Sequence, residues 1–87
     1  MTLRELLKKP FWAPKDLSLA MQISVSTART KIMMIRRELA EQGFINLTKS
    51  KAPTKVVVER LGIDVEWLER NGGLDYDLTK NREKEVK

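Results

Sequence analysis

The segment between Ser24 and Gly43 contains neither glycine nor proline, and it constrains the fold more than any other part of the chain. Within it, apolar residues recur at spacings of four, three and four, namely Ala28, Ile32, Ile35 and Leu39. This spacing places their side chains on one face of an α-helix. Ser24 is a favourable N-cap, and Gly43 favours a left-handed backbone that ends a helix. The sequence therefore predicts a long helix with one buried face.

Shorter helices are expected on either side of this one. Thr2 and Glu5 fit a capping box for a first helix, which must end before Pro10. Pro14 suits the first position of a second helix over 15–21, and Asp64 caps a last helix over 65–70 with Trp67 and Leu68 facing inward. Phe11 and Trp12, between the first two helices, are expected in the core.

Residues 54–62 allow two interpretations. Three consecutive valines favour a strand, which would pair with 44–47 as the wing of a winged helix. Thr54 as a cap and Leu61-Gly62 as an ending favour a helix, which we prefer. The expected fold is thus an all-α domain of about five short helices, with a winged helix carrying a hairpin at 44–58 as the alternative. We expect this domain to span 1–71 and to be followed by a charged, flexible tail over 72–87.

Cysteine and histidine are both absent, which removes disulfides, the usual zinc ligands and the usual general base at neutral pH. Two pairs of carboxylates, Asp64 with Glu66 and Asp75 with Asp77, fall at a helix start and in the polar tail, where capping and solubility explain them. We expect no enzyme activity, no cofactor and no metal. No apolar run approaches the roughly 18 residues that span a bilayer, and the N-terminus lacks the apolar stretch of a signal peptide. A cytoplasmic protein without a membrane partner is expected.

Charge is distributed unevenly along the chain. Residues 1–62 hold twelve Lys or Arg and five Asp or Glu, a net charge of +7, whereas residues 63–87 carry −2. A basic body suits a polyanionic partner, most commonly a nucleic acid. Charge alone also allows RNA binding, but the only Tyr, Tyr76, lies in the expected tail, and we expect no aromatic pair on a strand that could stack bases.

Residues 16–29 have the pattern of a helix-turn-helix. Ser18 and Ala28 supply small residues where the two helices touch, and Ile23 supplies the apolar residue of the turn. Gln22 stands where glycine is usual, at a cost of about 1 kcal/mol. Because such a second helix enters the DNA major groove by its N-terminal part, its exposed residues are the candidate DNA contacts, with three flanking cations added for non-specific attraction. The candidate set is Ser24, Val25, Ser26, Thr27, Arg29, Thr30 and Met33, with Lys15, Arg36 and Arg37.

These residues carry suitable chemistry. Arg29 can bind a guanine edge with two hydrogen bonds, and Ser26 or Thr30 can bond a base or a phosphate. Val25 can touch a thymine methyl group. Ser24 and the amides at the helix start suit a backbone phosphate.

Two further segments, 35–44 (Ile-Arg-Arg-Glu-Leu-Ala-Glu-Gln-Gly-Phe) and 52–63, add to the helix-turn-helix motif. Together with it, they make the chain resemble small proteins of phages and integrative elements of Gram-positive bacteria. The resemblance covers roughly residues 12–63. It implies a cytoplasmic DNA-binding protein, a transcriptional regulator or an excisionase-like factor, that acts in multiples. Residue by residue, it carries over Ser24, Ser26, Thr27, Arg29 and Thr30 as the DNA-facing set.

The leading hypothesis is therefore sequence-selective binding of double-stranded DNA by a transcriptional regulator. One helix makes few contacts, so we expect a homodimer or cooperative multimer on DNA, with 65–68 and the tail as contact regions. An excisionase-like architectural factor is the first alternative. The second is a protein-interaction module of the antirepressor type, whose partner is a phage or host protein.

Overall fold

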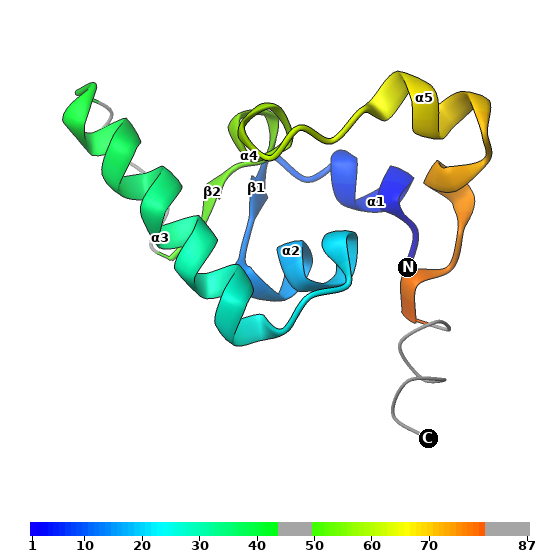
Figure 1. The fold of residues 1–87 in the computed structure, drawn as a ribbon, viewed down its shortest axis with the longest axis horizontal. Coiled ribbons are helices and arrows are strands. Elements are labelled where there is room, and N and C mark those ends of the chain that lie inside the picture. Colours follow the sequence, from blue (N-terminus) through cyan, green and yellow to red (C-terminus); the bar gives the residue numbers. More distant parts are fainter. Residues whose placement is uncertain (44–49, 80–87) are drawn as a thin grey trace.

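The computed structural model describes residues 1–43 and 50–79 and is mostly helical, with a small two-stranded antiparallel sheet (Figure 1). The helices of the described part are α1 (Leu3–Leu7), α2 (Pro14–Met21), α3 (Val25–Glu41), α4 (Thr54–Arg60), α5 (Val65–Arg70) and the short 3-10 helix η1 (Gly73–Asp75). The strands are β1 (Phe11–Trp12) and β2 (Ala52–Pro53). In Figure 1, α3 forms one side of the molecule and α5 lies at the opposite end.

The helix boundaries follow the local capping signals. The Thr2 hydroxyl accepts from the Glu5 amide while the Glu5 carboxylate accepts from the Thr2 amide, which confirms the predicted capping box. Pro14 occupies the first position of α2. Ser24 and Asp64 cap α3 and α5 as predicted. These ends form where expected because a cap acts through residues only three positions away.

The core lies where α1, α2, α3 and α4 meet around β1. Trp12 is fully buried, and its indole N–H donates to the Leu6 carbonyl at 2.8 Å. The predicted buried face of α3 is confirmed in full, because Ala28, Ile32, Ile35 and Leu39 all belong to the core. Phe11 is only half-buried.

Residues 54–60 form a helix, so the preferred interpretation is confirmed and no wing strand runs through the valines. The partner of β1 is β2, with Phe11 opposite Pro53 and Trp12 opposite Ala52. Thr54 is the first residue of α4 and not its cap; its amide donates to the Pro10 carbonyl and its hydroxyl to the Lys9 carbonyl, at 3.0 and 2.5 Å. The strand expected at 44–47 lies outside the described residues.

The chain after α5 differs from the expected tail. Leu74 and Leu78 are buried and belong to the core. The Leu78 amide donates to the Met1 carbonyl at 2.9 Å, and Thr2 pairs with Asp77 in an isolated β-bridge. Residues 72–79 thus pack against α1, because two leucines spaced four apart are enough to attach this short segment to apolar surface. The rest of the expected tail, 80–87, lies outside the described residues.

An ion pair joins this segment to α1. The Arg4 guanidinium contacts the Asp75 carboxylate at 2.9 Å and the Glu69 carboxylate at 3.4 Å. The hydrogen bond from Arg4 lowers the pKa of Asp75 below its ordinary value. All three side chains are exposed to solvent, so the pair fixes the geometry of the surface more than it stabilises the fold.

One prediction for α5 is wrong. Leu68 packs against the core as expected, but Trp67 is 55 % exposed. The helix is short and lies at the edge of the molecule, so its inner face has room for only part of its apolar side chains.

Candidate nucleic-acid interface

α2 and α3 pack against each other across a tight turn, which sets the direction of α3. Gln22 adopts a left-handed backbone with φ 55° and ψ 46°, and its side-chain amide donates to the Leu19 carbonyl at 2.6 Å. The Ser18 hydroxyl, almost fully buried, donates to the Ile23 carbonyl at 2.5 Å. Ala28 has no exposed surface. Small side chains at Ser18 and Ala28 are what let two helices approach closely at such a turn.

The hydroxyl groups at the start of α3 are partly used within the helix. The Ser24 hydroxyl accepts from the Thr27 amide at 3.1 Å and donates to Thr27 Oγ1 at 2.9 Å. The Thr30 hydroxyl donates to the Ser26 carbonyl at 3.2 Å. The hydroxyl protons of Ser24 and Thr30 are therefore committed within the helix, and these two side chains can offer an incoming group only an acceptor. The Ser26 hydroxyl, exposed and with no bond to another part of the described chain, remains a donor.

Positive charge dominates α3. Residues 25–37 contain four basic residues and no Asp or Glu; the acids of the helix, Glu38 and Glu41, come at its C-terminal end. Glu38 forms an ion pair with Arg60 of α4, which neutralises that carboxylate. Arg29 is exposed and forms no ion pair with any residue of 1–43 or 50–79, so all five of its N–H donors are available.

Arg36 is held more firmly than Arg29. It is half-buried, and one of its guanidinium nitrogens donates to the Lys51 carbonyl at 2.6 Å. Arg37 is exposed beside it.

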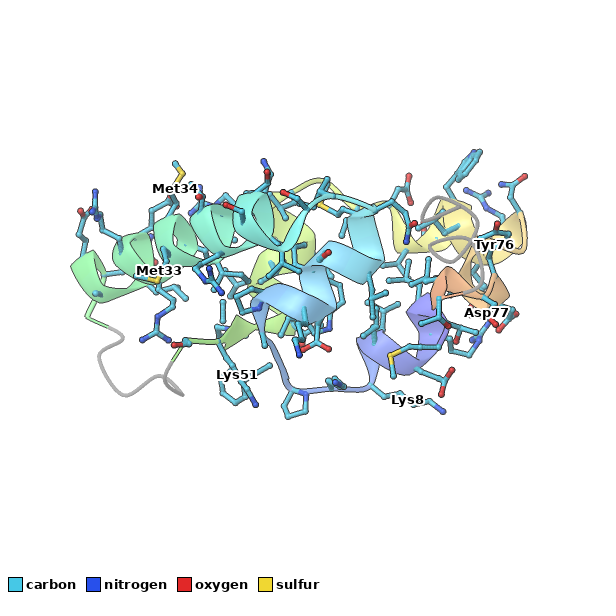
Figure 2. The ribbon with its side chains drawn as sticks, turned by 90° about the horizontal axis from the view of Figure 1, so that it is seen from below. Lys8, Met33, Met34, Lys51, Tyr76 and Asp77 are labelled. Carbon is cyan, nitrogen blue, oxygen red and sulfur yellow. The ribbon has the colours of Figure 1, made fainter. Side chains whose placement is uncertain are left out.

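A shallow depression runs along the exposed face of α3. It is lined by Arg29, Thr30, Met33, Met34, Arg36 and Arg37, so it gathers five of the predicted site residues. Met33 and Met34 are more than half exposed, and Figure 2 shows both on α3. The depression thus combines three arginines with the flexible apolar side chains of Met33 and Met34. This combination suits a partner that offers both anionic groups and an apolar surface.

Two further predicted residues meet at the junction of α2 and α3. Lys15 and Val25 line a second depression together with Ser18 and Leu19. Val25 is half-buried, whereas Lys15 is exposed. Ser24, Ser26 and Thr27 lie at the exposed start of α3. Nine of the ten predicted residues thus belong to α3 or to its N-cap, and Lys15 of α2 joins them through the depression that it lines with Val25, although Val25 and Arg36 are less accessible than expected.

Sequence analysis missed Met34 and the lysines next to β2. Met34 is 58 % exposed, and its apolar character gave no reason to place it on the outer face. Its position in the helix gave that reason, because Met34 does not share the spacing of three and four residues that places Ile32 and Ile35 on the buried face. Lys51 and Lys55 carry no local signal, since the contact of Lys51 with Arg36 and the position of Lys55 near Lys8 depend on the pairing of β1 with β2.

The described residues offer no group of three or more acidic side chains that could hold a metal ion. No helix among them has the length and apolar character needed to cross a membrane. Comparison with known proteins finds no matching family model, no matching curated protein and no matching solved structure. What this chain does must therefore be argued from its own residues.

Proposed function

We propose that this chain is a cytoplasmic helix-turn-helix protein that binds double-stranded DNA sequence-selectively through α3 and regulates transcription, in a phage or mobile element. One observation carries the proposal: the exposed face of α3, from Ser26 to Arg37, presents the exposed side chains of Arg29 and Arg37 and no carboxylate. The close packing of α2 on α3 through Ser18 and Ala28, with Gln22 in the turn, is the second support.

Each group on this face has a separate task. Arg29, whose donors are all available, is the residue for a guanine edge. Ser26 supplies a hydroxyl donor to a base or a phosphate, while Thr30 and Ser24 act as acceptors or through their carbon atoms. Met33 offers an apolar contact to a thymine methyl group. Arg37 of α3 and Lys15 of α2 add attraction to phosphates that does not depend on sequence.

The proposal is tested by selection from random duplex DNA with the wild type, followed by affinity measurements across 50–200 mM salt. On the selected site, Arg29→Ala is expected to lower selectivity over a scrambled site by about 1–3 kcal/mol while retaining most salt-dependent binding. Arg70→Ala is the matched control, because Arg70 lies on α5 and carries the same charge. Equal selectivity in the wild type and Arg29→Ala, or no enrichment of any site, would contradict the proposal.

Binding as a homodimer or in cooperative multiples is part of the same proposal, because a single helix makes too few contacts for tight specific binding at physiological salt. Exposed Trp67 lies within the contact region predicted at 65–68 and supports it as the place where copies meet. The stoichiometry on the selected site, measured by analytical ultracentrifugation, checks this point. A strict monomer on a short asymmetric site would remove it and leave DNA binding intact.

One observation favours a second candidate function, a protein-interaction module. Met33 and Met34 form an exposed apolar pair within the basic depression, and flexible methionines suit surfaces that bind protein partners. Under this alternative, Arg29→Ala leaves activity intact, whereas replacing both methionines with Ser abolishes it.

A further inference from the structure

A second group of lysines lies outside α3, where β1 meets β2. Lys8 follows α1, Lys51 precedes β2, and Lys55 is the second residue of α4. All three side chains are exposed. None of them belongs to the residues that the helix-turn-helix pattern singles out.

Backbone contacts hold these lysines on one surface although more than forty positions separate Lys8 from Lys51. The Thr54 amide and hydroxyl bond the carbonyls of Pro10 and Lys9, and Phe11 pairs with Pro53. The segment that carries Lys8 is thereby joined to the segment that carries Lys51 and Lys55. Figure 2 shows Lys8 and Lys51 pointing to the same edge of the molecule, opposite the edge to which Met34 points.

The surface keeps a net positive charge after its acids are counted. Lys8 and Lys55 line one shallow depression with Lys9, and Glu59 of α4 is the acidic residue there. Lys9 is neutralised by Asp16 at 2.8 Å. Within 1–43 and 50–79, Lys8, Lys51 and Lys55 form no ion pair, so the depression itself holds two unpaired cations, Lys8 and Lys55, and one carboxylate.

This surface is continuous with the exposed face of α3. Arg36 lines the α3 depression with Arg29 and Arg37, and its guanidinium also contacts the Lys51 carbonyl. A basic strip therefore runs from α3 through Arg36 to Lys51. The contact uses the main chain of Lys51 and leaves its ammonium group available.

We propose that Lys8, Lys51 and Lys55 bind the sugar-phosphate backbone of the duplex whose major groove receives α3, an inference that rests on the proposed function. A helix in the major groove, about 12 Å wide, has a phosphate backbone on either side of it. Lysines bind phosphates as point charges without reading sequence, and such contacts fix the register and orientation of a protein on DNA. The pairing of β1 with β2 holds these three at a set position relative to α3, so that α3 enters the groove in one orientation.

The test compares wild type with the triple variant Lys8→Gln, Lys51→Gln, Lys55→Gln on the site selected by the wild type. The slope of log affinity against log salt is expected to fall in magnitude by about 0.9 for each lysine that contacts a phosphate. Selectivity over a scrambled site should stay unchanged, because these contacts do not read bases. In hydroxyl-radical footprinting, the triple variant should lose protection of the DNA backbone beside the base pairs that α3 contacts. Protection of those base pairs themselves should not change.

Two controls separate local contact from net charge. The triple variant with Arg in place of each lysine keeps the charge and should keep the wild-type slope. Arg70→Gln removes one charge on α5, at the end of the molecule opposite α3, and should leave the slope unchanged. Circular dichroism confirms that each variant is folded.

A triple glutamine variant with the wild-type slope overturns this inference and leaves DNA reading by α3 standing, provided that Arg29→Ala still loses selectivity. A slope that falls by the same amount per charge in Arg70→Gln also overturns it, since the effect is then one of net charge. If the wild type fails to bind DNA at 50 mM salt, the proposed function falls, and this inference falls with it.

Discussion

Gln22 shows how one residue sets the direction of α3. Its left-handed backbone is unfavourable for a residue with a side chain, by about 1 kcal/mol relative to glycine. The hydrogen bond from its side-chain amide to the Leu19 carbonyl offsets part of that cost. The turn therefore keeps a glycine-like shape without glycine, and the Ser24 cap can begin α3 two residues later.

Replacing Gln22 separates these two effects. Gln22→Ala retains the left-handed strain and loses the hydrogen bond, whereas Gln22→Gly loses both. We expect the glycine variant to be more stable than the alanine variant by about 1 kcal/mol. Urea unfolding followed by circular dichroism measures the difference, and an alanine variant at least as stable as the glycine one would show that the backbone here is not strained.

At the scale of elements, the contact between α2 and α3 determines whether the exposed face of α3 is presented. Ala28 of α3 has no exposed surface, and Ser18 of α2 is almost fully buried. α4 and β2 then support α3 from its other side through the Glu38–Arg60 ion pair and the Arg36–Lys51 contact. The orientation of the arginines is thus a property of the packed helices and not of α3 alone.

Enlarging Ala28 tests this contact. Ala28→Leu should lower the free energy of unfolding by about 1–3 kcal/mol, because the added carbon atoms have no space between the helices. Ala40→Leu is the matched control, since Ala40 is exposed on the same helix and the same change there should stay within about 0.5 kcal/mol. Equal effects at the two positions would mean that α2 and α3 are not in close contact.

Across the whole molecule, the two ends of the described chain are joined far from α3. Leu74 and Leu78 pack into the core beside α1, and the Arg4–Asp75 ion pair lies over this junction. Its exposed position makes the ion pair a small contributor, so the two leucines are the main attachment. This junction completes the core on the side opposite the candidate interface.

Leu78→Ala is therefore expected to lower the free energy of unfolding by about 2 kcal/mol or more, because Leu78 is 7 % exposed and its removal opens a cavity. Tyr76→Ala changes a side chain of the same segment that is 52 % exposed, and should cost less than about 1 kcal/mol. Thermal unfolding of both variants makes the comparison. A Leu78 variant as stable as the wild type would place residues 72–79 outside the folded domain.

The sequence by itself determined the helices, because their signals are local. Caps at Thr2, Ser24 and Asp64 act over three residues, and the buried face of α3 follows from apolar spacing within one helix. The sequence also indicated most of the candidate interface, because the residues of α3 that do not belong to its buried face are the ones exposed to solvent. For 54–60 the sequence allowed both a helix and a strand. The segment is a helix because burial of Val57 in the core outweighs the strand preference of three valines.

Only the tertiary structure decided the contacts between distant segments. Pairing of β1 with β2 gave Thr54 its hydrogen bonds to the Pro10 and Lys9 carbonyls and brought Lys51 beside Arg36. The packing of 72–79 against α1 buried Leu74 and Leu78. The position of α5 at the edge of the molecule left Trp67 exposed. Each depends on which surfaces remain uncovered after the helices pack. No pattern within a few residues of the chain records that information.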